Sequence, residues 1–112
     1  KELKSTSNKA EQGNWLEKRQ LKSFNLPTQV FFESDEKNNR TIMEVSTIDR
    51  PGVLSRIGMA MDMCGAKLQN AKIATYGERA EDIFYLQNDE NNMIEDPLKF
   101  ECLKSSIIDA LS

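Results

Sequence analysis

The chain has 112 residues, a formal net charge of −3 and no histidine. This length is enough for one small domain with a thin core, so self-association or a partner domain is expected. The acidic balance argues against a nucleic-acid partner, and the missing histidine excludes His-based general base catalysis and most zinc sites. No apolar run approaches the ~20 residues that cross a bilayer, so we expect no membrane partner and a cytoplasmic location.

The sulfur-containing residues do not predict a metal site. Cys64 and Cys102 are far apart in the sequence and lack a metal-ligand spacing, so we interpret both as small buried hydrophobic residues in a reducing compartment rather than as a disulfide. Met59, Met61 and Met63 alternate along a predicted helix and therefore point to different faces. This spacing favours core filling over metal binding.

Composition divides the chain at about residue 23. Residues 1–23 are rich in Lys, Glu, Ser, Asn and Gln and are predicted to be a tail or an interdomain connector. Trp15 is compatible with a contact to a neighbour or with a cap on a preceding domain. The basic cluster of Lys18, Arg19 and Lys22 favours a solvated face over an anion site. Residues 24–112 are predicted to be the folded domain.

Two strands are predicted to begin this domain. Pro27 is followed by the β-prone run Thr28–Ser34, and turn-forming residues at 35–39 separate it from a second run, Thr41–Ile48. We expect the two runs to pair as a hairpin. The loop is too long for a two-residue turn, so the register is not predicted.

The stretch from Asp49 to Leu54 is predicted to be a strand-to-helix corner. Pro51 suits a first helical turn, Gly52 leaves the backbone uncovered, and a helical apolar period follows. Such a corner presents unpaired backbone N–H groups at the positive end of a helix. It can therefore bind a carboxylate or a phosphate without a special side chain.

The remaining elements follow from periodicity. A helix is predicted after the corner, and Gly65 is the expected left-handed residue at its end. Gly58 inside the helix lowers helix stability by up to ~1 kcal/mol relative to Ala, which is tolerable where another element approaches closely. The buried stripe of this helix consists of Leu54, Ile57, Met61 and Cys64, with Val53 beside them. Residues 66–76 are predicted to be a strand with a bulge near Gln69–Asn70, because the alternation is imperfect. Residues 80–88 follow as a central strand covered on both faces.

A second helix is predicted to end the chain. Asp96 is the expected cap and Pro97 the first helical residue. Its predicted buried stripe consists of Phe100, Leu103, Ile107 and Leu111.

The order from Thr41 onward is βαββα, the ferredoxin-like pattern without its last strand. We expect the run Thr28–Ser34 to occupy the edge that the last strand normally fills. The predicted fold class is therefore α+β, with a four-stranded antiparallel sheet and two helices on one face.

Other functions of this fold class are not supported by the sequence. The predicted strands lack the basic and aromatic pattern of RNA-binding versions, and the corner lacks the Cys-x-x-Cys of metal-transfer versions. Glu78, Glu81 and Asp82 lie next to a turn without a nucleophile or an orienting partner, so we interpret them as solvated charges. We predict no catalytic residues.

Two segments carry a resemblance to a known family. The run Asp-Arg-Pro-Gly-Val-Leu-Ser-Arg-Ile from Asp49, followed by Gly65 and a strand, resembles an ACT domain, a small amino-acid-sensing module. The run from Asn70 to Asp82 is more specific and resembles the last ACT domain of the bacterial PII uridylyltransferase/uridylyl-removing enzymes. Arg19–Phe24 and Pro27–Val30 resemble the connector that precedes this domain.

The resemblance implies a regulatory role. Enzymes of this family attach UMP to the PII nitrogen signal protein and remove it, and their tandem ACT domains are held to sense glutamine. The expected partners are glutamine, a second ACT domain and, through the complete enzyme, PII. We expect no catalysis and no cofactor in this chain, because magnesium belongs to the catalytic domains of such enzymes.

The resemblance also implies a ligand site between two domains. One side would consist of Asp49, Arg50, Pro51, Gly52, Val53 and Leu54, with Asp49 accepting from the ligand ammonium group. The other side would consist of Lys67, Leu68, Gln69 and Asn70. Amino-acid-binding relatives often carry Asn at the position of Lys67, and a long cation there either excludes the usual pose or reaches the ligand carboxylate. Arg50 is compatible with a ligand role or with covering the adjacent strand.

Two further interpretations remain open at this stage. Some ACT domains bind nothing and only pair with other domains, so a structural dimerisation module is the alternative to a sensor. The ACT domain of another multidomain regulator is the third possibility.

Overall fold

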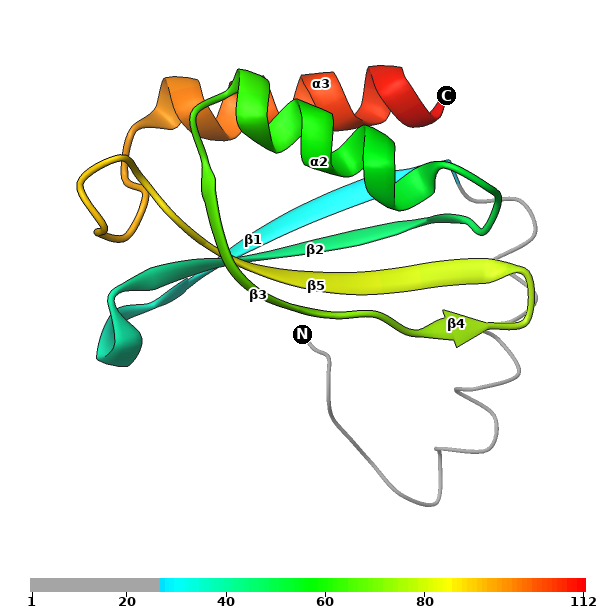
Figure 1. Cartoon of the computed structure of the whole chain (residues 1–112), viewed down its shortest axis with the longest axis horizontal. Helices are drawn as coiled ribbons and strands as arrows, with labels where there is room; N and C mark the ends of the chain where they lie inside the picture. Colours follow the sequence, from blue (N-terminus) through cyan, green and yellow to red (C-terminus); the bar gives the residue numbers. More distant parts are fainter. Residues whose placement is uncertain (1–26) are drawn as a thin grey trace.

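The computed structural model describes residues 27–112, which form an antiparallel sheet with two helices on one face (Figure 1). The predictions for residues 1–23, including those for Trp15 and the basic cluster, lie outside the described residues. No helix in the described range is long and apolar enough to cross a membrane.

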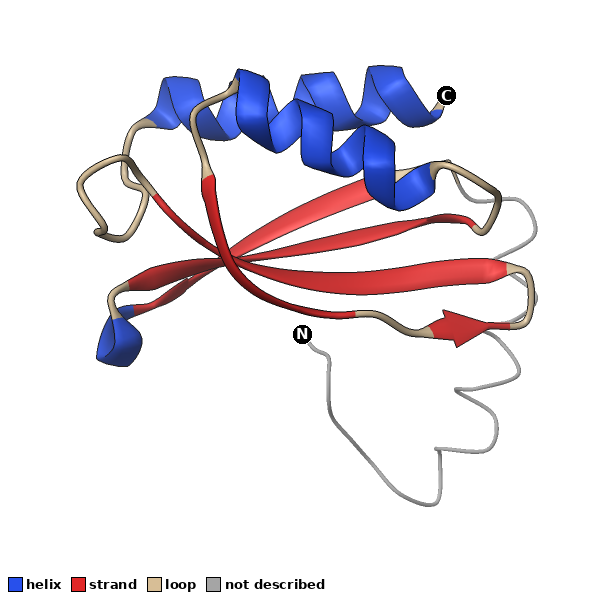
Figure 2. Cartoon of the chain, viewed as in Figure 1, coloured by secondary structure: helices blue, strands red, loops and turns tan. Residues whose placement is uncertain are grey.

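Figure 2 shows the alternation of strands and helices along the chain. A hairpin comes first, then a helix, three strand segments where two strands were predicted, and a final helix. The elements are β1 Gln29–Asp35, the short 3-10 helix η2 Glu36–Asn38, β2 Arg40–Ile48, α2 Val53–Met63, β3 Lys67–Lys72, β4 Thr75–Tyr76, β5 Arg79–Gln87 and α3 Pro97–Leu111.

The sheet order confirms that the N-terminal run replaces the missing last strand. The strands lie in the order β1-β2-β5-β3, and every neighbouring pair is antiparallel. β1 pairs with β2 from Gln29↔Ser46 to Asp35↔Arg40. The ferredoxin-like α+β fold predicted from the sequence is therefore confirmed, with β1 at the edge beside β2.

The run at 66–76 differs from one continuous strand. The predicted bulge is present, because the register of β3 on β5 shifts between Leu68 and Asn70. The strand then breaks, and β4 continues along β5 with Thr75↔Ala80, so the sheet has five strands rather than four. The backbone N–H of Ala74, in the break, donates to Asp82 Oδ1 over 3.3 Å instead of to a neighbouring strand. A side chain thus takes the place of a ladder bond.

The core lies between the sheet and the helices. Met43 and Val45 from β2, Phe84 and Leu86 from β5, and Leu103 of α3 are almost completely buried there. The residues alternate along each strand because successive side chains point to opposite faces. β5 is the central strand, and Tyr85 on its other face is also buried, with the Arg40 guanidinium 4.2 Å from its ring centre. The prediction that both faces of this strand are covered is confirmed.

Helix α2 begins later than predicted. Pro51 lies in the preceding turn, Gly52 is the N-cap residue, and Val53 is the first helical residue. The buried stripe accordingly starts at Val53 rather than at Leu54, whose side chain is 49% exposed. The C-terminal end is as expected, because Gly65 has φ +73°.

The other helix ends follow common capping patterns. The amides of Ala66 and Gly65 donate to the carbonyl oxygens of Met61 and Asp62, the Schellman arrangement. At the start of α3, Asp96 accepts a hydrogen bond from the Leu98 amide and Pro97 follows it, as predicted.

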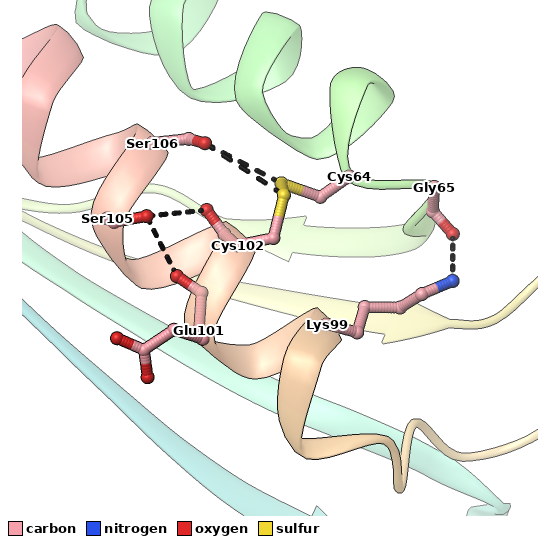
Figure 3. Close-up of a disulfide and its surroundings, with 7 residues drawn as sticks. All are labelled: Cys64, Gly65, Lys99, Glu101, Cys102, Ser105 and Ser106. Carbon is pink, nitrogen blue, oxygen red and sulfur yellow. Dashed lines mark hydrogen bonds between the residues drawn. A yellow bond between two sulfur atoms is a disulfide. The ribbon is translucent and has the colours of Figure 1, made fainter.

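The prediction of two free cysteines is wrong. Cys64 and Cys102 form a disulfide between the end of α2 and the second turn of α3, with their Cα atoms 5.8 Å apart (Figure 3). Two helices packed antiparallel bring together residues separated by 38 positions, and nothing local in the sequence marks such a pair. The disulfide also removes the argument for a reducing compartment. Ser106 Oγ lies 3.7 Å from Cys64 Sγ and, since the disulfide carries no S–H, the hydroxyl is the donor.

Candidate functional site

A cleft lies where β2 ends and α2 begins. In Figure 1 this connection lies at the end of the sheet that carries β4. The volume of the cleft is about 320 Å³, at the lower end of the range for small-molecule sites. Five residues of the predicted corner line it, and the others come from the first turn of α2, β4, β5 and the β3–β4 break. The lining residues are Asp49, Arg50, Gly52, Val53, Leu54, Ser55, Ile73, Thr75, Ala80 and Asp82.

The backbone of the corner supplies hydrogen-bond donors to this cleft. Gly52 has φ +88°, a left-handed conformation that glycine adopts without strain. The carbonyl oxygens of Arg50 and Gly52 accept from the amides of Val53 and Arg56. Within residues 27–112, no carbonyl accepts from the amides of Leu54 and Ser55. These two N–H groups stand at the positive end of α2, where an anionic group is stabilised.

Asp82 contributes a buried carboxylate to the same cleft. Its side chain is only 2% exposed, so the interpretation of Asp82 as a solvated turn charge is wrong. Oδ1 accepts from the Ala74 amide, and no donor in the described part of the chain reaches Oδ2. Burial raises the pKa of Asp82, and the negative charge of Asp49 raises it further. A cation bound in the cleft would therefore stabilise the ionised form of Asp82.

The two charged residues of the corner have different settings. Asp49 is exposed at the rim, and its backbone N–H donates to the Glu78 carbonyl over 2.8 Å, which fixes the corner to the β4–β5 turn. Arg50 also lines the cleft, but its Nη2 donates to the Leu111 carbonyl at the end of α3. This bond gives Arg50 a structural contact that neither of the two sequence interpretations included.

The other half of the predicted site lies elsewhere on this chain. Lys67, Leu68, Gln69 and Asn70 are exposed along the β3 edge and do not line the cleft. Lys67 Nζ donates to Asn91 Oδ1 over 2.7 Å, and Asn70 Oδ1 accepts from the Ala71 amide. The sequence interpretation placed these residues against the corner of a second domain. Their ligand role stays a prediction.

A simple signal in the sequence could have identified Asp82. It lies two and four residues before Phe84 and Leu86, so it shares their face in an extended strand. A carboxylate on the core face of a strand is rare unless it is paired or functional. Charged residues are also common beside turns such as Gly77–Glu78, so the charges at Glu81 and Asp82 have a second explanation in the sequence.

The cleft combines opposite electrostatic preferences. Free amides at the start of α2 favour an anionic group, and Asp49 and Asp82 favour a cationic one. A small zwitterion satisfies both. No group of three or more metal-ligating side chains occurs among the described residues.

The fold and the corner define a small ferredoxin-like α+β domain with a cleft at its first strand-to-helix connection. Comparison with known proteins gives relatives in several bacteria, whereas no protein-family model matches the chain. Three of these relatives are named bifunctional uridylyltransferase/uridylyl-removing enzyme. They come from Methylococcus capsulatus (40% identity over 94 residues, 84% of this chain), Pseudomonas putida (44% over 93 residues, 83%) and a Psychrobacter species (40% over 94 residues, 84%).

The matched part of the chain is homologous to a segment of the bifunctional uridylyltransferase/uridylyl-removing enzymes, which confirms the resemblance predicted from the sequence. The chain spans only about a tenth of the length of these relatives, since the match covers 11% of the first and 10% of the second. It therefore corresponds to one small domain of a much larger enzyme.

Proposed function

We propose that this chain is a regulatory ACT domain that binds an amino acid, glutamine in the first place, and thereby controls a uridylyltransferase/uridylyl-removing enzyme acting on PII. The observation that carries the proposal is the cleft at Asp49–Leu54. It lies at the corner that the sequence motif marks, and it offers free amides beside acidic side chains. The homology to a segment of these enzymes supports the regulatory setting.

The ligand is expected to act through differential affinity. A ligand shifts an equilibrium between two domain arrangements only as far as it binds one of them more tightly. The β3 edge is suited to the second arrangement, because Lys67–Asn70 are exposed there and an unpaired edge accepts another strand. Pairing of two ACT domains along this edge would bring these residues to a neighbouring corner.

The test is titration calorimetry of the 112-residue chain with L-glutamine at concentrations up to millimolar. We expect saturable binding by the natural chain and weaker binding by Asp49→Ala. Asp62→Ala is the matched control, because Asp62 is an exposed acid near the far end of α2. Absence of heat and of thermal stabilisation, in a sample shown to pair, would overturn the proposal.

A pairing module without a ligand is the second candidate, and the exposed apolar residues of the sheet edge favour it. Leu68 and Ile73 are 51% and 53% exposed, on β3 and directly after it. If pairing alone is the function, Leu68→Lys abolishes regulation of the enzyme by glutamine while Asp49→Ala leaves it unchanged. If Asp49→Ala abolishes this regulation as well, the sensor is supported.

A further inference from the structure

We propose that Asp82, on the floor of the cleft, binds the ammonium group of the ligand, so that the site selects small zwitterions with a free α-amino group. This inference rests on the proposed function and adds to it a residue and a ligand class. It also places the cationic end of the ligand within one chain, beneath the start of α2.

The position of Asp82 is the first argument. β5 carries it on the face that packs against the helices, directly opposite Val45 of β2. Asp82 is only 2% exposed yet lines the cleft, so a ligand bound in the cleft can reach its side chain. By contrast, Asp49 lies exposed at the rim, where water competes for its carboxylate.

The hydrogen bonding of Asp82 is the second argument. Oδ1 accepts from the Ala74 amide in the β3–β4 break, and this bond fixes the orientation of the carboxylate. Oδ2 has no donor within residues 27–112. A buried carboxylate oxygen without a partner costs free energy, and a ligand N–H⁺ group that reaches it removes this cost.

The charge balance of the cleft is the third argument. Burial and the nearby charge of Asp49 raise the pKa of Asp82, so the ionised form of this side chain costs free energy unless a cation is bound beside it. The guanidinium of Arg50 is held by the Leu111 carbonyl and is not bonded to Asp82. An ammonium group therefore supplies the positive charge that the described surroundings of Asp82 do not provide.

The helix start accounts for the other end of the ligand. The amides of Leu54 and Ser55 lack carbonyl partners in the described range, and both residues line the cleft with Asp82. An α-amino acid can place its carboxylate at these amides and its ammonium group at Asp82. A cleft of about 320 Å³ restricts the ligand to small members of this class.

The experiment compares L-glutamine with glutaramate, which is glutamine without its α-amino group. We expect the natural chain to bind glutaramate at least about tenfold more weakly, the usual scale for loss of a charged hydrogen bond. In Asp82→Asn the two compounds should bind within about twofold of each other, because Asn cannot neutralise the ammonium group. Asp62→Asn makes the same chemical change away from the cleft and should keep the tenfold preference.

The outcomes separate this inference from the proposed function. If the natural chain binds glutamine and Asp82→Asn keeps the preference over glutaramate, the role of Asp82 is wrong and the sensor proposal stands. If the natural chain binds no amino acid, both are wrong.

A second measurement does not depend on folding of the variant. In the natural chain, a ¹³C titration of the Asp82 carboxyl should give a lower midpoint pH with saturating L-glutamine than without it, because an ammonium group beside Oδ2 favours the ionised form, and glutaramate should not lower it. A midpoint that saturating glutamine leaves unchanged would overturn the inference.

Discussion

The side chain of Arg50 donates a hydrogen bond from Nη2 to the carbonyl oxygen of Leu111, which joins the corner before α2 to the last turn of α3. Arg56, one turn into α2, makes a longer contact of 3.4 Å with the Ala110 carbonyl. Because α2 and α3 are antiparallel, two cations of one helix start thus face the carbonyl end of the other helix. Cations near the last carbonyls of a helix are stabilising.

Replacing Arg50 by Ala should therefore weaken the end of α3. We expect the free energy of unfolding to fall by about 1 kcal/mol, the usual net value of one such bond. Urea denaturation measures it, with Arg56→Ala as the control that should lose less, because its contact is longer and more exposed. Equal losses in the two variants would contradict the special role of the Arg50 contact.

The disulfide predicts a large stability difference between oxidised and reduced protein. Cross-linking positions 38 residues apart removes conformational freedom from the unfolded chain. This effect is worth about 2–4 kcal/mol for loops of such length. The double variant Cys64→Ser/Cys102→Ser should have a free energy of unfolding lower by that amount in urea denaturation, and the natural chain with reductant should match it.

The double variant itself is the control for the reductant, since it should not respond to it. Lys99 Nζ donates to the Gly65 carbonyl beside the disulfide and keeps the two helices in contact without the covalent bond (Figure 3). Identical urea midpoints for oxidised and reduced natural protein would show that the cysteines are not bonded in solution.

The raised pKa of Asp82 predicts how stability changes with pH. A carboxyl group whose pKa is higher in the folded state stabilises the fold while it is protonated, below its unfolded value near 3.8. This contribution is lost as the pH rises through the higher folded pKa, because the folded chain then holds a buried charge. The natural chain should therefore lose stability over this pH range relative to Asp82→Asn, which stays neutral.

The measurement is the difference in unfolding free energy between Asp82→Asn and the natural chain from pH 3.5 to 7. It should grow in favour of the variant as the pH rises and then level off. Asn still accepts from the Ala74 amide, so the strand break keeps its hydrogen bond. A difference that is constant with pH, or that grows toward acid pH, would contradict a raised pKa.

Local patterns in the sequence were sufficient for the order of the main elements and for the corner that lines the cleft. Pro27 followed by a β-prone run indicated the edge strand, Asp96 and Pro97 located the start of α3, and the corner motif located the cleft. Each of these signals depends on residues close together in the chain. Capping and turn preferences are local physical effects, so a single sequence carries them.

The features that were missed depend on contacts between distant residues. The disulfide follows from the packing of two helices, and Asp82 is buried where β5 meets the corner before α2. The break between β3 and β4 depends on Asp82 as well, because its carboxylate takes the Ala74 amide from the ladder. These properties arise from tertiary contacts, which local patterns in a single sequence do not reveal.

Gly52, at the start of α2, and Gly58, inside it, should respond in opposite directions to replacement by Ala. Gly58 lies inside the helix, and a Cβ built there meets nothing within 4 Å, so no close approach of another element explains this glycine. Gly58→Ala should raise the free energy of unfolding by about 0.5–1 kcal/mol through helix propensity and reduced unfolded-state entropy.

Gly52 should behave differently although its surroundings are also open. A Cβ there would meet only Arg56 Nε at 3.9 Å, but the residue has φ +88°, where an L side chain is strained. Gly52→Ala should therefore lower stability by about 1 kcal/mol and weaken ligand binding, because relief of the strain turns the amides of Leu54 and Ser55 away from the cleft. Urea denaturation and glutamine titration of both variants measure these effects. If Gly52→Ala is as stable as Gly58→Ala, the left-handed conformation of residue 52 is not required. In that case this conformation does not fix the direction of the Leu54 and Ser55 amides.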